Sequence, residues 1–221
     1  MNKYIIADIH GEYDKLVACL KSVNFDKEKD LLIQLGDVVD GGSGSYECIE
    51  LLLSIKNSIF IRGNHDELWF KNIENPDNNF LWWQGARETY QSYLDNNVDP
   101  IIHESFFLKQ REYYIDEDNN YFVHGGFNRH HSLESQEGST VFSWDRDLLL
   151  QAMSYESMKD YEHPFRIVGN PKEVFLGHTP TTLWDITTPI KAANIWNLDT
   201  GSGKGGLLTI MNLETKEYNQ F

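Results

Sequence analysis

Short apolar runs and longer segments with helical spacing alternate along the first third of the chain. The apolar runs are typical of buried strands and cover residues 4–7, 31–35 and 58–61. The segments with helical spacing cover residues 13–23 and 46–55. Such alternation of strand and helix predicts a parallel sheet with covering helices.

The middle of the chain, residues 67–108, has mainly helical spacing and is rich in aromatic side chains. These aromatic residues are Trp69, Phe70, Trp82, Trp83, Tyr90 and Tyr93. They would form either a stacking wall for a nucleobase or phosphotyrosine, or the core of a helical insert. The core is the favoured interpretation, because large rings usually gain most from burial.

From residue 113 onward, the pattern returns to short apolar runs. These runs cover residues 113–116, 121–123, 174–176, 195–198 and 207–211. They predict a second, mixed sheet built after the helical insert. Two sheets flanked by helices make a four-layer αββα sandwich of the α/β class, and 221 residues suit a single domain spanning residues 1–221.

Composition narrows the class of partner and the environment. The net charge of −15 argues against binding along a nucleic-acid backbone, which requires clustered lysine and arginine. Cys19 and Cys48 lie in segments with helical spacing and are expected to be buried, reduced thiols. No leader pattern precedes the first strand and no apolar run reaches membrane length, so a cytoplasmic monomer without a membrane partner is expected.

Five polar blocks, most of them at the ends of apolar runs, carry side chains that bind metal ions. In chain order they are Asp8-Ile9-His10-Gly11, Gly36-Asp37-Val38-Val39-Asp40, Gly63-Asn64-His65-Asp66, His124-Gly125-Gly126 and Gly177-His178-Thr179. Aspartate, asparagine and histidine together suit divalent ions such as Mn²⁺, iron or Zn²⁺. Because open α/β sheets hold their chemistry at the carboxyl ends of strands, the blocks predict a metal centre there.

Spacing within the blocks indicates which side chains share a site. On an extended strand, residues two apart point to the same side, so Asp8 and His10 can bind one ion. Asn64 and His65 are adjacent and point to opposite sides, so one can bind metal while the other faces a substrate.

The order and residues of the blocks resemble the phosphoprotein phosphatase (PPP-type) family of calcineurin-like metallophosphoesterases, especially its small bacterial and phage lambda-type branch. Two further stretches extend the resemblance over nearly the whole chain: Trp83-Gln84-Gly85-Ala86-Arg87-Glu88-Thr89 with Tyr93, and Asp199-Thr200-Gly201 through Gly206-Leu207-Leu208-Thr209. The resemblance implies the αββα sandwich and a metal-dependent hydrolase with two divalent ions. Mn²⁺ is the expected metal, with iron, Zn²⁺ or Ni²⁺ as alternatives.

The resemblance also implies a role for each metal-binding block. One ion would be held by Asp8, His10 and Asp37, with Asp37 bridging to the second ion. The remaining ligands of the second ion would be Asn64, His124 and His178. The implied activity is hydrolysis of phosphomonoesters, either phosphorylated Ser, Thr or Tyr in proteins or small phosphate esters, by direct attack of a metal-bridging hydroxide.

A proton donor and a phosphate clamp are implied as well. His65 would donate a proton to the leaving oxygen, and Asp40 would orient its ring and raise its pKa. The alternative is that Asp40 only caps the turn before the glycine run. The candidates for contacting the substrate phosphate are Arg146, Arg62 and Asn64.

One position departs from the family pattern. Family members normally place an arginine where this chain has Gly41, and glycine cannot hold two phosphate oxygens. Phosphate binding is then weaker, or another cation reaches in, or the space admits a bulkier substrate. Lys204, in the glycine-rich loop near the end, is a further candidate cation. On these grounds Gly41→Arg is expected to lower the KM for small phosphomonoesters.

Two other functions remain open. Symmetrical hydrolysis of bis(5'-nucleosyl) tetraphosphates occurs in a sister branch, which typically keeps that arginine and lacks the aspartate at position 40. A catalytically impaired protein that binds phosphorylated ligands is the other alternative, suggested by Gly41. The remaining histidines are expected at the surface, with His130 and His131 candidates for bordering the substrate: His103, His130, His131 and His163.

Overall fold

The computed structural model describes residues 1–74, 85–158 and 163–221. Its strands are β1 (Lys3–Ile6), β2 (Leu31–Gln34), β3 (Asn57–Phe60), β4 (Tyr113–Ile115), β5 (Tyr121–Val123), β6 (Val174–Leu176), β7 (Ile190–Ala192), β8 (Ile195–Asn197), β9 (Thr209–Asn212) and β10 (Tyr218–Gln220). Its α-helices are α1 (Tyr13–Ser22), α2 (Ser45–Leu53), α3 (Asn64–Lys71), α4 (Ala86–Asp95), α5 (Glu104–Lys109), α6 (Thr140–Trp144) and α7 (Asp147–Met158). Short 3-10 turns are η2 (Pro100–His103), η3 (Leu133–Ser135), η4 (Thr181–Trp184) and η5 (Ser202–Lys204).

Two five-stranded sheets, in the orders β10-β9-β1-β2-β3 and β4-β5-β6-β8-β7, share one apolar layer. Because successive strand residues point to opposite faces, each sheet contributes alternate side chains to two cores. Ile5 and Phe122 lie in the core shared by the sheets, whereas Ile6 and Val123 belong to the two outer cores. The layers are therefore helix, sheet, sheet and helix, which confirms the predicted αββα sandwich.

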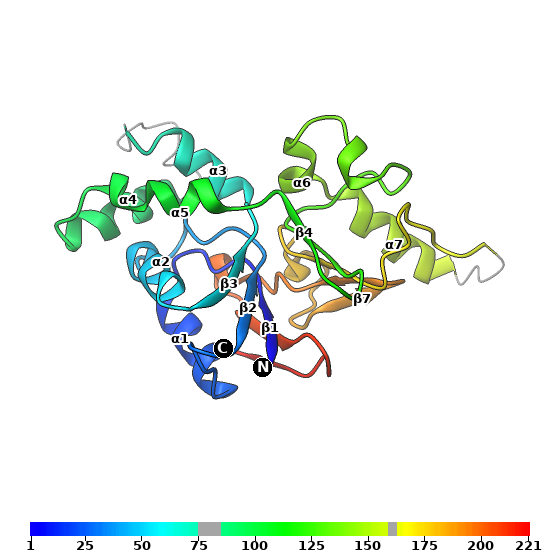
Figure 1. Ribbon diagram of the computed structural model, residues 1–221, viewed down its shortest axis with the longest axis horizontal. Coiled ribbons are helices and arrows are strands. Elements are labelled where there is room, and N and C mark those ends of the chain that lie inside the picture. The colour runs from blue at the N-terminus through cyan, green and yellow to red at the C-terminus, as the bar shows by residue number, and fades with distance from the viewer. Residues whose placement is uncertain (75–84, 159–162) are drawn as a thin grey trace.

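The helices cover the outer faces of the two sheets. Figure 1 shows α1 to α5 on the side of the first sheet and α6 and α7 on the side of the second. Leu16 of α1, Ile49 of α2 and Trp69 of α3 are buried in the first outer core. Leu148 and Leu149 of α7 are buried in the second. Within the described residues, none of the helices combines the length and the apolar character that a membrane crossing requires.

The carboxyl ends of the parallel strands meet at one edge of the sandwich. β1, β2 and β3 are parallel neighbours in the first sheet, and β5, β6 and β8 are parallel neighbours in the second. The loops that follow these strands bond to one another: Asp8 N donates to Gly36 O at 3.2 Å, and Gly177 N donates to His124 O at 2.8 Å. This edge gathers most of the polar blocks of the sequence.

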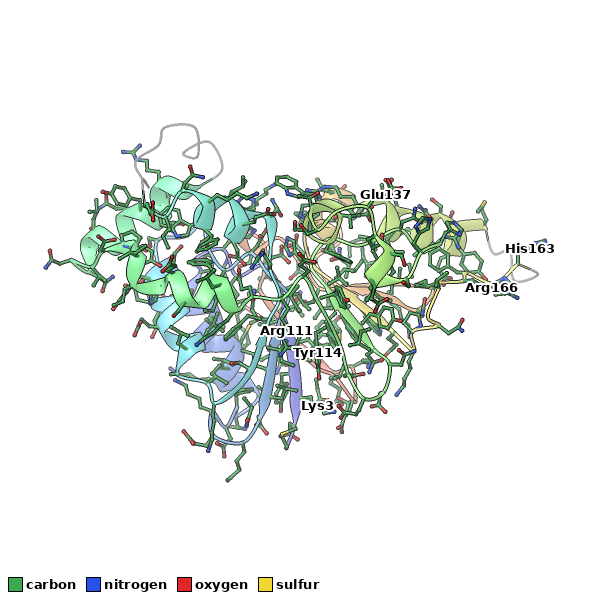
Figure 2. The ribbon with its side chains drawn as sticks, turned by 45° about the horizontal axis from the view of Figure 1, so that its top comes forward. Lys3, Arg111, Tyr114, Glu137, His163 and Arg166 are labelled. Carbon is green, nitrogen blue, oxygen red and sulfur yellow. The ribbon has the colours of Figure 1, made fainter. Side chains whose placement is uncertain are left out.

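The segment between α5 and β4 joins the two sheets. Ile61 and Arg111 form a parallel bridge next to β3. Figure 2 shows Arg111 beside Tyr114 of β4, and its guanidinium carbon lies 5.6 Å from the centroid of the Tyr114 ring. At the start of β1, Lys3 pairs with Glu117 in the turn after β4. Contacts between the two sheets therefore extend beyond their shared apolar layer.

The final hairpin joins a different sheet from the one predicted. The run over residues 207–211 was expected in the second sheet, but β9 pairs antiparallel with β1, and β10 pairs with β9. Ile210 faces the first outer core and Met211 the core between the sheets, so the apolar pattern fits either sheet. Only the observed pairing of β9 with β1 shows that this run belongs to the first sheet.

The sequence pattern did not predict β7, α6 or α7. In α7, exposed Leu150 directly follows buried Leu149.

The described aromatic side chains of the helical insert pack into a hydrophobic core, as predicted. Trp69 and Tyr93 are fully buried and stack at 6.0 Å between ring centroids, with Phe70 and Tyr90 packed against the same core. Trp82 and Trp83 lie outside the described residues. Cys19 and Cys48 are buried and free, which confirms the predicted thiols.

One histidine expected at the surface is buried instead. His103 bonds to the Tyr93 hydroxyl at 2.7 Å and to Glu50 Oε1 at 2.8 Å, and only 1% of its surface is exposed. Both ring nitrogens therefore have partners, which removes the cost of burying the ring. His130, His131 and His163 are exposed, as expected. His130 and His131 line a cavity that shares no residue with the predicted metal centre.

Candidate metal centre and active site

The structure brings the predicted metal ligands together in two overlapping groups. Asp8, His10 and Asp37 offer ligand atoms that all lie within 4.8 Å of one another. Asp37, His124 and His178 form the second group by the same measure. Asn64 adjoins the second group, with its Oδ1 3.1 Å from His124 Nε2. The division into two groups with Asp37 in common matches the one that the family resemblance implied.

A single oxygen of Asp37 lies between the two groups. Its Oδ2 is 3.8 Å from His10 Nε2 and 3.3 Å from His124 Nε2. The other oxygen, Oδ1, accepts the backbone N–H of His65 at 2.9 Å. Asp37 is 2% exposed, so this hydrogen bond fixes the carboxylate in a buried orientation. Asp37 is therefore the carboxylate that would be common to both groups if each held a cation.

The histidines of the groups are oriented by backbone carbonyls. Nδ1 of His10 donates to Asp40 O at 2.6 Å, and Nδ1 of His124 donates to Leu35 O at 2.7 Å. Nε2 of His178 is buried and has no hydrogen-bond partner among the described residues. Fixing one ring nitrogen in this way directs the other toward a metal, as in protein metal sites generally.

The electrostatics of the site also fit cations. Burial, followed by the charges of Asp199 and Asp37, raises the pKa of Asp8 well above its ordinary value. Burial and the neighbouring His124 lower the pKa of His178 to about 3, so its imidazole is neutral and able to bind metal. Crowded buried carboxylates are costly unless positive charge lies among them. The donor set of carboxylates, imidazoles and an amide fits divalent ions.

The backbone that presents the ligands differs from the extended strand that the spacing suggested. β1 ends at Ile6, and Asp8 and His10 follow it with φ of 44° and 51°. Asp37 and His178 also have positive φ, at 56° and 68°. Such backbone is uncommon for residues other than glycine and tends to occur at functional sites. The two side chains do share an ion-sized space, but a tight left-handed loop and not strand alternation brings them together.

The side chains of Asn64 and His65 point in different directions, as predicted, but the cause is helix geometry and not alternation along an extended strand. They are the first two residues of α3, and successive helix residues are turned by about 100°. The start of α3 is held by Asp66, which is fully buried. Its carboxylate accepts the backbone N–H groups of Asp37, Val38 and Gly63 at 3.0, 2.9 and 3.3 Å. One side chain thus connects the loop that carries Asp37 to the helix that carries Asn64.

The predicted proton-donor pair is formed. His65 Nδ1 donates to Asp40 Oδ2 at 2.9 Å, and Asp40 is 2% exposed. The second carboxylate oxygen of Asp40 accepts the Thr89 hydroxyl at 2.9 Å, and Thr89 Oγ1 accepts the Asp40 backbone N–H at 2.8 Å. Asp40 is therefore more than a turn cap. The helical insert, through Thr89 in α4, holds the carboxylate that orients His65.

We expect the metal-free protein to keep His65 protonated to unusually high pH. Burial alone lowers its pKa, but the charge of Asp37 and the hydrogen bond to Asp40 outweigh this and raise it to about 9. NMR titration of the ring signals should place His65 near that value, while His178 stays neutral until about pH 3. In Asp40→Asn the midpoint for His65 should fall, because one of the stabilising negative charges is gone. An unchanged midpoint in this variant would contradict the pairing.

A cavity of about 310 Å³ lies over these groups. His10, Asp37, Asn64, His65 and His178 line it together with Arg146. Arg146 Nη1 donates to His178 O at 3.1 Å and to Thr179 Oγ1 at 3.2 Å, which directs the guanidinium to the cavity wall. Arg146 thus lines the cavity together with the predicted metal ligands and His65.

Arg62 is not brought to this cavity. Its Nη2 donates to the carbonyl oxygens of Phe107 and Gln110 at 3.3 and 3.4 Å. It lines a separate space with Glu67 and Glu112. Arg62 therefore ties α5 to the strand edge, and the structure offers it no path to the substrate phosphate.

Three buried residues contribute to the site although the sequence motifs that contain them suggested no role for them: Asp66, Thr89 and Asp199. Asp199 lines the cavity, is 3% exposed, and accepts the Gly201 backbone N–H at 2.9 Å. Each stood inside a stretch that matched the family pattern. The partners of Asp66 and Thr89 lie far away in sequence, so the sequence stretch that contains each residue does not reveal its contact.

The comparisons with known proteins agree with this geometry. A family model described as calcineurin-like phosphoesterase matches residues 1–203. Serine/threonine-protein phosphatase 2 of Salmonella typhimurium is 28% identical over 216 residues, which cover 96% of this chain and 92% of that protein. A symmetrical bis(5'-nucleosyl)-tetraphosphatase of Klebsiella pneumoniae is 43% identical over 67 residues, 30% of this chain and 24% of that protein.

Solved structures share the fold. The crystal structure of a candidate diadenosine tetraphosphatase aligns with a TM-score of 0.69 over all of this chain and 92% of that one, at 17% identity. That identity supports the fold alone. The family match covers most of the sequence, including every predicted metal ligand. The chain belongs to the calcineurin-like phosphoesterase family of metal-dependent hydrolases.

Proposed function

We propose that this chain is a two-metal phosphomonoesterase that hydrolyses phosphorylated Ser, Thr or Tyr side chains or small phosphate esters. The observation that carries the proposal is the 2.9 Å contact between His65 and Asp40 in the same cavity as both metal-ligand groups. A protonated imidazole placed beside two cation sites can donate to an alkoxide that leaves phosphorus.

Each residue then has a distinct task. Asp8 and His10 hold one ion, Asn64, His124 and His178 hold the other, and Asp37 is shared. Bound divalent ions would supply a hydroxide nucleophile near neutral pH and positive charge for the phosphoryl oxygens. We expect Mn²⁺, although the same donors also suit iron, Zn²⁺ or Ni²⁺.

The substrate contacts come from the remaining residues of the cavity. Arg146 is positioned to donate to phosphate oxygens, and Asn64 presents its side chain beside the second group. His65 is held by Asp40 on one side and by the Asp37 contact to its backbone on the other. The ring therefore cannot turn away without breaking the bond to Asp40, which keeps the proton close to the leaving oxygen.

Hydrolysis of dinucleoside tetraphosphates is the second candidate. The local 43% identity to a symmetrical tetraphosphatase favours it, but that match covers only 24% of the relative. The cavity of about 310 Å³ lies at the lower end of the roughly 300–1,000 Å³ range of ligand pockets. That volume suits one phosphate ester group better than two nucleosides joined by four phosphates.

A direct comparison of substrates tests the proposal. The purified protein, loaded with Mn²⁺, is given p-nitrophenyl phosphate, a phosphoserine peptide and diadenosine tetraphosphate in parallel. We expect turnover of the first two, with kcat/KM at least tenfold below theirs for the third, and loss of all activity on chelation. The metal content of the same sample is measured and should be two ions per chain.

The possible results separate the functions. A preference for the tetraphosphate would replace the phosphomonoesterase with the second candidate. Two bound ions with no hydrolysis of any of the three substrates would contradict both enzymes and leave a phospho-ligand-binding protein.

A further inference from the structure

One cation in the cavity has no part in the machinery described so far. Lys204 lines the same cavity as His65 and Arg146. It closes η5, is exposed, and forms no ion pair with any described residue. Arg146 and Lys204 are the basic side chains, other than histidines, among the described residues that line this cavity, which also contains the carboxylates of Asp37, Asp40 and Asp199.

The loop that carries Lys204 is fixed against the metal centre. A Cβ on Gly203 would lie 2.5 Å from Cγ of His10, so the loop backbone packs directly on a predicted metal ligand. On its other side, Lys15 Nζ donates to Ser202 O at 3.2 Å and to Gly206 O at 3.0 Å. The Asp199 carboxylate holds Gly201 from inside the cavity. Four contacts therefore fix the loop that carries Lys204, and three of them join it to residues far away in sequence.

The same loop lies next to Gly41, which cannot carry a cation of its own. A Cβ on Gly41 would lie 3.5 Å from Gly203 O and 3.3 Å from the Cβ and the carbonyl oxygen of His10. Gly41 also has φ of +124°, where residues with side chains are strained. The expected effect of Gly41→Arg on KM would therefore be mixed with backbone strain. Positive charge on this wall has to come from another element, and η5 supplies it.

We propose that Lys204, which lines the same cavity as Arg146, contacts the substrate phosphate and sets the affinity of this cavity for phosphate. The inference rests on the proposed function and adds a residue to it. A lysine ammonium is a compact point charge with three donors, so it can follow a phosphate without the fixed geometry of a guanidinium. This contact would be formed on the side that Gly41 leaves open.

Lys204→Ala tests this in the Mn²⁺-loaded protein with p-nitrophenyl phosphate and with inorganic phosphate as a competitive inhibitor. One exposed charge-assisted contact is lost, so we expect the KM and the inhibition constant of phosphate to rise together by about tenfold. The kcat should change by less than about threefold, because the metal ligands and His65 are untouched. Lys204→Arg should restore most of the affinity, and Lys109→Ala, an exposed lysine outside the cavity, should match the parent protein.

Salt separates direct charge contact from a structural effect. Raising ionic strength from about 0.1 M to about 1 M shortens the Debye length from about 10 Å to about 3 Å. The ratio of KM values between Lys204→Ala and the parent should shrink accordingly. Unchanged KM and unchanged phosphate inhibition in Lys204→Ala would overturn the inference, as would a defect that Lys204→Arg and salt both leave in place.

Failure of the proposed function is distinguished by a second readout. Calorimetric binding of inorganic phosphate to the Mn²⁺-loaded protein requires no turnover. An inactive parent protein would overturn the phosphomonoesterase, while phosphate binding that is about tenfold weaker in Lys204→Ala would still support the role of Lys204. Equal phosphate binding by both proteins would overturn the inference whatever the activity.

Discussion

Asp37→Asn is expected to abolish most activity and to reduce the bound metal below two ions per chain. Oδ2 of Asp37 lies between His10 and His124, and no other predicted ligand belongs to both groups. Asparagine keeps the size of the side chain and can still accept the His65 N–H, but it removes the negative charge that two cations would share. Losing several kcal/mol of metal-supplied stabilisation corresponds to a fall in kcat/KM of about a thousandfold or more.

Metal content and kinetics must be measured on the same Asp37→Asn sample. Elemental analysis gives ions per chain, and hydrolysis of p-nitrophenyl phosphate at saturating Mn²⁺ gives kcat/KM. Asp14→Asn, an exposed position in α1, controls for the loss of one acidic residue from an acidic chain. Circular dichroism of both variants checks the fold. Two bound ions and activity within tenfold of the parent would show that Asp37 is not the shared ligand.

The metal-binding residues could be predicted because they occur in short sequence motifs and have side chains of the types that bind metal ions. They lie in five short blocks, and Asp37, His124 and His178 lie within a few residues of a strand end. The order of strands and helices then requires those ends to meet at one edge. Residue type and strand order were therefore sufficient to predict a metal centre at this edge, whereas the division into two groups with Asp37 in both was implied by the family resemblance.

Contacts between distant segments could not be predicted in the same way. The Thr89 bond to Asp40 joins α4 to the loop after β2, and the helical spacing over residues 67–108 does not say which side chains of the insert face that loop. The left-handed backbone at Asp8 and His10 depends on hydrogen bonds from the neighbouring loop, such as His10 N to Asp37 O at 3.0 Å. Such geometry is set by tertiary structure, because the residues themselves do not favour it.

Arg62 and Lys204 show that the surroundings of a basic side chain could not be predicted from the sequence either. Both are basic residues close to motif stretches of the sequence, and Arg62 is the stronger candidate by sequence because it directly precedes the Gly63-Asn64-His65-Asp66 block. In three dimensions Arg62 is held by carbonyl groups of α5, while Lys204 reaches the cavity from a loop about 160 residues after Gly41. The charge of a side chain is readable from sequence, but the cavity it faces is not.

His65→Gln is expected to lower kcat in a way that depends on the leaving group. His65 is placed by Asp40 to donate a proton, and general acids contribute roughly 10²- to 10⁴-fold to rate. The serine alkoxide of a phosphopeptide leaves poorly without a proton, so kcat for that substrate should fall by about this amount. p-Nitrophenolate is a stable anion near neutral pH, so its release needs the proton far less and its kcat should fall by less than about tenfold.

The ratio of the two losses, and not either loss alone, identifies His65 as the acid. Glutamine retains a donor for Asp40 and contains no titratable group, so the cavity keeps its shape while the proton is lost. Metal content should remain at two ions, since His65 belongs to neither ligand group. Asp40→Asn should show the same dependence on leaving group with a smaller loss, and His130→Gln, at an exposed position in another cavity, should show none. Equal losses for both substrates, accompanied by loss of metal, would instead make His65 a residue that supports the metal centre through the Asp37 contact at its backbone.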